Sequence, residues 1–228
     1  MRSKLKIILL VIIMMLFTIK PIYAHAANKK YMWIKSNTHI KAKPKRKSKD
    51  IGIIYTYEKV KRINETGKWT LCKYKNKIGY IQTKYLTYSL PKFSMKKCPD
   101  NNFKAYMDFR CITNKSSKQY KLQQKAYTTK EGIRKIDNRY CIALGSYYSS
   151  KIGTKIDLIT YDNKVIKCIL ADQKADKDTI NNHMQARDGS FLEIIVDTKI
   201  LPKTAKLMGD VSYTKAFNYK IKKIKVYK

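Results

Sequence analysis

The chain has 228 residues, of which 44% are hydrophobic and 11% aromatic, so it can bury a core and global disorder is not expected. With 8 glycines, 5 cysteines and no internal repeat, it fits neither a collagen-like chain, nor a disulfide knot, nor a solenoid. Fifty Lys+Arg against 16 Asp+Glu give a formal net charge of +34. An AT-rich genome accounts for part of the lysine excess but not for the scarcity of acids. The charge therefore predicts a polyanionic partner: nucleic acid, anionic lipid or an anionic cell-wall polymer.

Residues 1–26 have the pattern of a signal peptide, and this pattern indicates which of these polyanions is the expected partner. Arg2, Lys4 and Lys6 precede a 13-residue apolar stretch over residues 7–19, which is shorter than the roughly 20 residues of a spanning helix. The alternative is an uncleaved anchor. We predict cleavage and secretion, with no integral membrane segment in the mature chain. Nucleic acid is then not an expected partner, whereas peptidoglycan and teichoic polymers outside the membrane are.

The cysteines and histidines predict neither a metal site nor a cofactor. Five cysteines leave at least one unpaired, and the chain has no C-x-x-C motif and no Cys/His cluster. Cys141 and Cys168 lie in strand-like stretches, so they either form a disulfide or remain buried thiols. The fingerprints of phosphate-binding and dinucleotide-binding loops are also missing from the sequence.

Residues 31–88 predict a small antiparallel barrel of short strands. Apolar and polar residues alternate over residues 50–55, 59–63, 69–74 and 77–82, and turn-forming residues separate these stretches. Residues 89–99 contain two prolines and no periodicity, which predicts a linker.

Several motifs in this first domain resemble those of a bacterial SH3-like (SH3b) domain, and they occur in that family's order. They are Ile40–Pro44, Ile51–Gly52, Gly67–Trp69, Ile78–Ile81 and Tyr85–Leu86. The first motif departs from the family's Asn-x-Arg-x-Gly-Pro. The resemblance implies an SH3-like barrel that attaches to peptidoglycan or its cross-bridge peptides.

Aromatic side chains are the candidate ligand-binding residues of this domain. A cationic barrel with exposed aromatic rings can bind wall glycopeptide by stacking and by charge. The candidates are Tyr55, Tyr57, Trp69, Tyr74 and Tyr80. The alternative for each is inward packing, because alternate strand positions face the core.

Residues 100–228 predict a second β domain with one short helix. The helix is expected over residues 118–128, and the strands over residues 140–144, 155–160, 165–171, 191–196 and 219–227. Five or six strands with a long crossing loop favour a closed barrel.

The order of motifs here resembles the three-aspartate (3D) domain, a six-stranded double-psi β-barrel shared with rare-lipoprotein-A-like proteins. The matching pieces are Ile142–Gly145, Ile152–Lys155, Leu170–Asp172, Asp188–Glu193 and Asp197. Members of that family include peptidoglycan lytic transglycosylases, which need a protonated carboxyl beside an ionised partner. The resemblance implies Asp172 as the general acid and Glu193 or Asp197 as its partner.

Two departures leave the catalytic role open. Gln173 and Lys174 replace the family's Gly-Gly after the first aspartate, and the polar loop over residues 176–187 is longer. The acids between residues 172 and 197 are also consistent with surface caps or lysine partners. A calcium loop at Asp172, Asp176 and Asp178 is a weaker alternative, since its glycine turn and its bidentate glutamate are missing.

The sequence therefore predicts a secreted, monomeric, mostly β protein of the bacterial cell wall. The N-terminal domain is expected to bind peptidoglycan or its anionic polymers. Whether the C-terminal domain also cleaves peptidoglycan, as a lytic transglycosylase does, stays open at this point.

Overall fold

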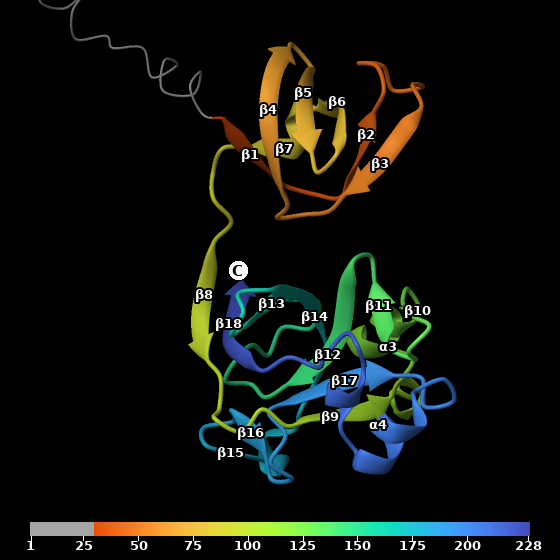
Figure 1. Ribbon diagram of the computed structural model, residues 1–228, viewed down its shortest axis with the longest axis vertical. Coiled ribbons are helices and arrows are strands. Elements are labelled where there is room, and N and C mark those ends of the chain that lie inside the picture. Colours follow the sequence, from red (N-terminus) through yellow and green to blue (C-terminus); the bar gives the residue numbers. More distant parts are fainter. Residues whose placement is uncertain (1–29) are drawn as a thin grey trace, which may run out of the picture. The chain divides into compact units, whose positions relative to one another are not determined.

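The computed structural model describes residues 30–228, and the predicted signal peptide lies outside them. The fold is mostly β and divides into two units, the first ending at Leu90 and the second running from Pro91 to Lys228 (Figure 1). Within residues 30–228, no helix is both long enough and apolar enough to cross a membrane.

The first unit is one seven-stranded sheet in the order β3-β2-β6-β5-β4-β1-β7, and every neighbouring pair is antiparallel. The four predicted strands are present, and three more complete the sheet. The elements are β1 (Tyr31–Ile34), β2 (Thr38–Lys41), β3 (Asp50–Ile54), β4 (Lys59–Thr66), β5 (Trp69–Tyr74), β6 (Lys77–Gln82), the 3-10 helix η1 (Thr83–Tyr85) and β7 (Leu86–Thr87).

The core of the first unit follows from strand alternation. Its fully or nearly fully buried members are Met32, Ile34, Ile40, Ile54, Val60, Cys72, Ile81 and Leu86. Gly79 lies where β6 passes β2, and a Cβ there would be 2.6 Å from the Lys41 carbonyl oxygen. Glycine thus permits the close approach of these two strands.

The second unit is a nine-stranded sheet with a central path β10-β11-β12-β14-β13-β18-β8, while β17 joins β12 to β9. Two of its pairs, β12–β14 and β17–β9, are parallel. The strands are β8 (Phe93–Lys97), β9 (Lys104–Asp108), β10 (Tyr127–Thr128), β11 (Arg134–Ile136), β12 (Arg139–Leu144), β13 (Lys155–Thr160), β14 (Val165–Gln173), β17 (Leu192–Val196) and β18 (Ile221–Tyr227).

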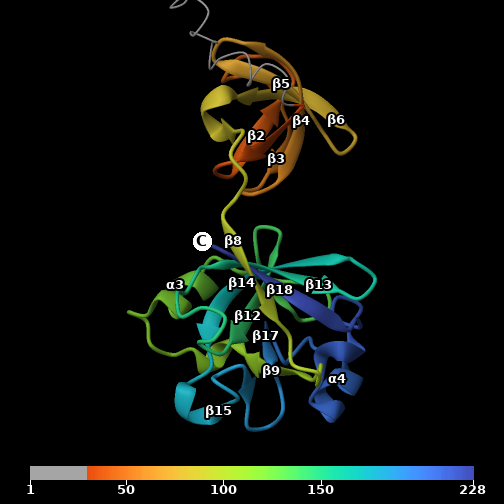
Figure 2. The ribbon, with the colours of Figure 1, turned by 90° about the vertical axis from the view of Figure 1, so that its left-hand side faces the viewer.

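The remaining elements of this unit are short. A separate hairpin pairs β15 with β16, and Figure 2 shows α3 and α4 at opposite sides of the unit. These elements are η2 (Phe109–Cys111), α3 (Lys118–Gln123), η3 (Asp176–Asp178), β15 (Thr179–Ile180), β16 (Gln185–Ala186), α4 (Lys203–Met208) and η4 (Val211–Tyr213).

The structure differs from three expectations about this region. The predicted linker over residues 89–99 contains β8, which pairs with β18 and so belongs to the second sheet. The helix ends at Gln123, because residues 127–128 pair with β11 instead of continuing it. The sheet has nine strands rather than six, and its pairing within residues 91–228 does not close into a barrel.

The central strands of the second sheet are buried on both faces. The larger core cluster includes Leu144, Cys168 and Leu170, and a smaller one includes Cys141 and Ile169. Cys168 lies opposite Tyr140 rather than Cys141, so the two thiols point to opposite faces of the sheet. All five cysteines are free, and the alternative of a Cys141–Cys168 disulfide is therefore wrong.

A buried ion pair ties the last strand to the sheet. Arg139, 4% exposed, donates to Asp157 Oδ1 at 2.8 Å and to the carbonyls of Ile156 and Cys168. The Tyr227 hydroxyl donates to Asp157 Oδ2 at 2.7 Å. A charge buried this deeply is tolerated only with such partners.

Candidate functional site

Two of the three predicted catalytic carboxylates lie in one cross-strand row. Ala143 on β12 is the register partner of Asp172 on β14 and of Glu193 on β17. Register partners project from the same face of a sheet, so both carboxylates flank the small Ala143 side chain on one face. Asp172 and Glu193 thus lie on either side of β12, about two strand spacings apart.

A β-bulge in β14 turns Asp172 toward this face. The register shifts between Ile142 and Ala143, so Ala171 has no partner on β12. Without the extra residue, strand alternation would point the Asp172 carboxylate into the larger core cluster. Bulges commonly redirect a side chain in this way.

The surroundings of Asp172 favour its protonated form. Burial raises the pKa of its carboxyl, and the nearby charge of Glu193 raises it further. Hydrogen bonds from the Gln119 side chain on α3 and from the Gln173 backbone oppose this shift only in part. A carboxyl whose pKa is raised near a second carboxylate is the arrangement that a general acid requires.

Glu193 is held by a buried lysine that the sequence analysis did not include among the site residues. The Lys174 side chain is 4% exposed, and its Nζ donates to Glu193 Oε1 and, at 2.9 Å, to Ser190 Oγ. The Ser190 hydroxyl in turn donates to Asp188 at 2.7 Å. Lys174 is therefore a buried cation that compensates the charge of the Glu193 carboxylate.

The β15–β16 hairpin closes over the same end of β12. The His183 carbonyl lies where a Cβ on Gly145 would be, at 1.9 Å, so only glycine fits there. Asn181, Asn182 and His183 all have positive φ, a rare conformation for three consecutive residues without glycine. His183 Nδ1 and Thr179 Oγ1 share a hydrogen bond of 2.7 Å that fixes this loop.

Asp197, the third predicted catalytic residue, does not join the pair. It follows β17, four residues beyond Glu193, and its Oδ1 is 3.2 Å from the Arg110 guanidinium. Arg110 also binds Asp108, which accepts hydrogen bonds from the Thr198 backbone and side chain. The Asp197 carboxylate thus belongs to a network that joins η2 to the end of β17, away from the row of Asp172 and Glu193.

Within residues 30–228, no group of three or more His, Cys, Asp or Glu side chains is arranged to hold a metal ion. Asp176, which the weaker calcium alternative included, accepts a hydrogen bond from Ser146 at 2.7 Å and lies 3.6 Å from His183. The contacts of Asp176 with Ser146 and His183 thus hold this loop in place.

The five candidate aromatic residues of the first unit fall into two places. Trp69 and Tyr80 are half-buried on the outer face of β5 and β6, because Thr70, Cys72 and Ile81 occupy the inward positions. Tyr80 lies opposite Leu71, two positions from Trp69, so the two rings are diagonal neighbours. We name Trp69, Leu71 and Tyr80 the outer aromatic patch.

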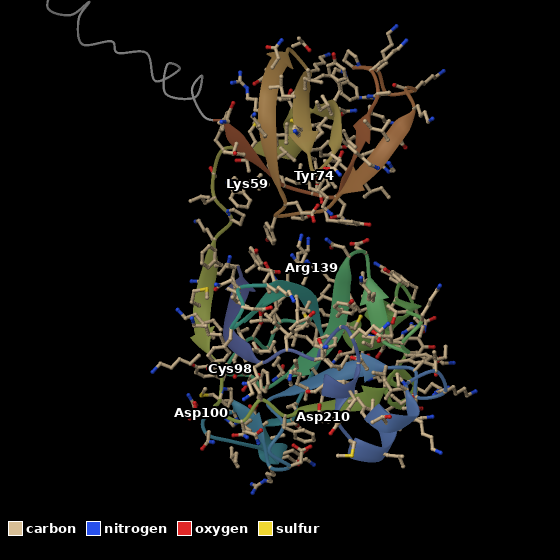
Figure 3. All side chains as sticks on the ribbon, in the orientation of Figure 1. Lys59, Tyr74, Cys98, Asp100, Arg139 and Asp210 are labelled. Atoms are coloured by element: carbon tan, nitrogen blue, oxygen red, sulfur yellow. The ribbon has the colours of Figure 1, made fainter. Side chains whose placement is uncertain are left out.

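The other three candidates lie around a turn at Glu58. Tyr74, which Figure 3 labels, donates its hydroxyl to Glu58 Oε2 at 2.5 Å. The Tyr55 amide donates to the same oxygen at 3.2 Å. Burial and Glu58 together raise the pKa of Tyr74. Tyr57 occupies the turn with φ 68°. Tyr74 is partly buried and packs against the core cluster of the first unit.

Comparison with protein-family models and with curated proteins finds no match for this chain.

Proposed function

We propose that the chain is a secreted cell-wall protein whose first unit, an SH3-like module, binds peptidoglycan or its anionic polymers. The outer aromatic patch is the observation that carries this proposal, since paired rings on a strand face suit stacking against sugar rings. Residues 31–90 hold fifteen lysines and arginines against three acidic residues, which supplies attraction to phosphate-rich polymers.

Sedimentation with purified sacculi tests this binding. The Trp69→Ala/Tyr80→Ala protein is expected to bind about tenfold more weakly than the parent, since each ring contact contributes roughly 0.5–1.5 kcal/mol. Ile53→Ala, an exposed apolar residue two strands away on β3, is the matched control and should bind as the parent does. Equal binding by all three proteins would contradict the proposed surface.

The row of Asp172 and Glu193 favours a second function, cleavage of the glycan strand by the second unit. The parallel pairs β12–β14 and β17–β9 support its relation to the double-psi fold. In this reaction Asp172 protonates the glycosidic oxygen as its bond to C1 breaks, and the sugar's own 6-hydroxyl bonds to C1. The hydroxyl proton passes to the carboxylate that Asp172 has become, or to Glu193, and a 1,6-anhydro sugar results.

Mass spectrometry of the soluble products tests cleavage. The parent is expected to release anhydro-muropeptides from sacculi, and Asp172→Asn is expected to release none while still sedimenting with the wall. Asp178→Asn, an exposed acid in the adjoining loop, is the control and should retain activity. Fragments from the Asp172→Asn protein would remove Asp172 from the reaction, whereas no fragments from the parent would leave only the binding function.

A further inference from the structure

The loop that joins β2 to β3 carries a dense positive charge. Five of its eight residues, 42–49, are basic and none is acidic, and all five basic side chains are exposed. We name residues 42–49 the basic loop. Its cations are Lys43, Lys45, Arg46, Lys47 and Lys49. Like charges at this density repel one another, so a polyanion laid across the loop would relieve that repulsion.

Hydrogen bonds hold the basic loop in a defined shape. The Ala42 amide donates to the Lys49 carbonyl at 3.0 Å, and the Ser48 amide donates to the Lys45 carbonyl at 3.1 Å. The Ser48 hydroxyl accepts from the Lys43 amide at 2.9 Å. These bonds use backbone atoms and one serine, so the charged groups are left for a ligand. Because the backbone is ordered beforehand, binding has a smaller entropic cost.

The carboxylate at the end of the basic loop is already engaged. Asp50 begins β3, and its two oxygens contact the Lys41 ammonium at 2.5 Å and His39 Nδ1 at 3.0 Å. Within residues 30–228, none of the five loop cations forms an ion pair with a carboxylate. The positive charge of the loop is therefore not compensated by the first unit itself.

The basic loop is continuous with the outer aromatic patch. Lys41, the last residue of β2, is the register partner of Tyr80 on β6 and of Asp50 on β3. Tyr80 is in turn the partner of Leu71 on β5. Register partners project from the same face of a sheet. The row therefore leads from the patch to the two residues that bracket the loop.

This surface suits a polymer that carries both phosphate and sugar. The row from β5 to β3 crosses three strand spacings, about 14 Å, which is longer than a single phosphate or sugar ring. The loop cations are lysines apart from Arg46, and lysine binds phosphate as a point charge, whereas carboxylate recognition favours the bidentate arginine. The rings of Trp69 and Tyr80 suit stacking against sugars. A phosphodiester chain whose units bear sugars supplies both groups.

We propose that the basic loop and the outer aromatic patch form one surface that binds a wall-linked phosphodiester polymer bearing sugars. The location of this polymer in the wall rests on the proposed function, whereas the preference for phosphate and sugar stands on the surface alone. Peptidoglycan without the polymer meets only the aromatic half of the surface and binds more weakly.

Sedimentation of the mature protein with two kinds of sacculi tests the proposal. One kind keeps its phosphodiester polymer, and the other has lost it by treatment with hydrofluoric acid, which cleaves phosphodiesters. The parent is expected to bind the untreated wall about tenfold more tightly. In calorimetric titration, glucosylated poly(glycerol phosphate) should bind saturably, and the same polymer without glucose about threefold more weakly.

A pair of substitutions separates the basic loop from the general positive field of the unit. Lys45→Gln/Lys47→Gln is expected to weaken binding to the glucosylated polymer about fivefold and to leave binding to treated sacculi unchanged. Its matched control, Lys30→Gln/Lys35→Gln, removes the same charge on either side of β1 and should weaken binding less than about twofold. All four side chains are exposed, so both proteins should fold.

Each outcome decides the proposal. Equal losses in the loop variant and its control would make the loop only part of the general field and overturn the proposed surface. Equal binding of treated and untreated walls would overturn it and leave attachment to peptidoglycan standing. Binding of the soluble polymer without sedimentation with either wall would support the surface and reject the proposed function. Tighter binding of a single-stranded oligonucleotide with the same number of phosphates would overturn the choice of ligand.

Discussion

Replacing Gly145 by alanine tests whether the hairpin over the candidate site is held as closely as the structure shows. The new Cβ would lie 1.9 Å from the His183 carbonyl oxygen, whereas real Cβ atoms essentially never approach another heavy atom within 3.0 Å. The hairpin must therefore move by about 1.1 Å. Such overpacking in a tight contact costs about 1–3 kcal/mol. For a unit of this size the melting temperature should fall by roughly 3–10 °C.

Calorimetric melting measures the stability, and amide NMR spectra locate the change in the hairpin over residues 179–186. Gly153→Ala is the control in the same unit, because its Cβ would meet no atom within 4 Å, although its φ of 91° carries a local cost of its own. Its spectral changes should stay near Gly153 and leave the hairpin unaltered. A melting temperature of Gly145→Ala within 1 °C of the parent, with hairpin resonances in place, would refute the close contact.

Three other substitutions test the charges of the second unit. Asp157→Ala leaves the Arg139 guanidinium buried without its carboxylate, so urea denaturation should show a loss of about 3–5 kcal/mol. Lys174→Met removes the cation from Glu193; because Glu193 is partly exposed, the expected loss is smaller, about 2 kcal/mol, and Lys177→Met at an exposed position should change little. Burial raises the pKa of Asp172, so the folded state holds its proton above the unfolded pKa of 3.8, and the free energy of unfolding falls as pH rises through that window. Asp172→Asn should remove this part of the pH dependence in urea titrations at successive pH values, and an unchanged slope would contradict the assigned environment.

The strands that the sequence predicts well are those with strict alternation or a continuous apolar stretch. The predicted strand over residues 155–160 coincides with β13, because turn residues bound it on both sides. By contrast, the sequence of β8 predicts a linker. Most of its residues are exposed, and the strand depends on pairing with β18. A strand that gains its stability from a distant edge leaves little periodicity in its own sequence.

In the candidate site too, the sequence motifs indicate individual residues, whereas their arrangement depends on how distant strands pair. The family resemblance implied Asp172 and Glu193, and the register places one on each side of Ala143. The bulge at Ala171 could not be predicted, because it depends on how β14 aligns with β12. Lys174 was noted only as a departure from a glycine, although a lysine after an apolar strand in an acid-rich segment was a signal for a buried partner.

The distribution of charge separates the proposed wall attachment from the proposed chemistry in this chain. Over residues 31–90, three acids can neutralise no more than three of fifteen basic side chains, so a positive field remains and acts at a distance on any polyanion. Over residues 91–228, thirteen acids accompany twenty-nine basic residues, and those at the candidate site have specific partners such as Lys174. The positive field of residues 31–90 weakens with added salt, whereas a buried pair such as Glu193 with Lys174 is screened much less. The wall attachment proposed for the first unit should therefore fail at a salt concentration at which the carboxylate row of the second unit is still intact.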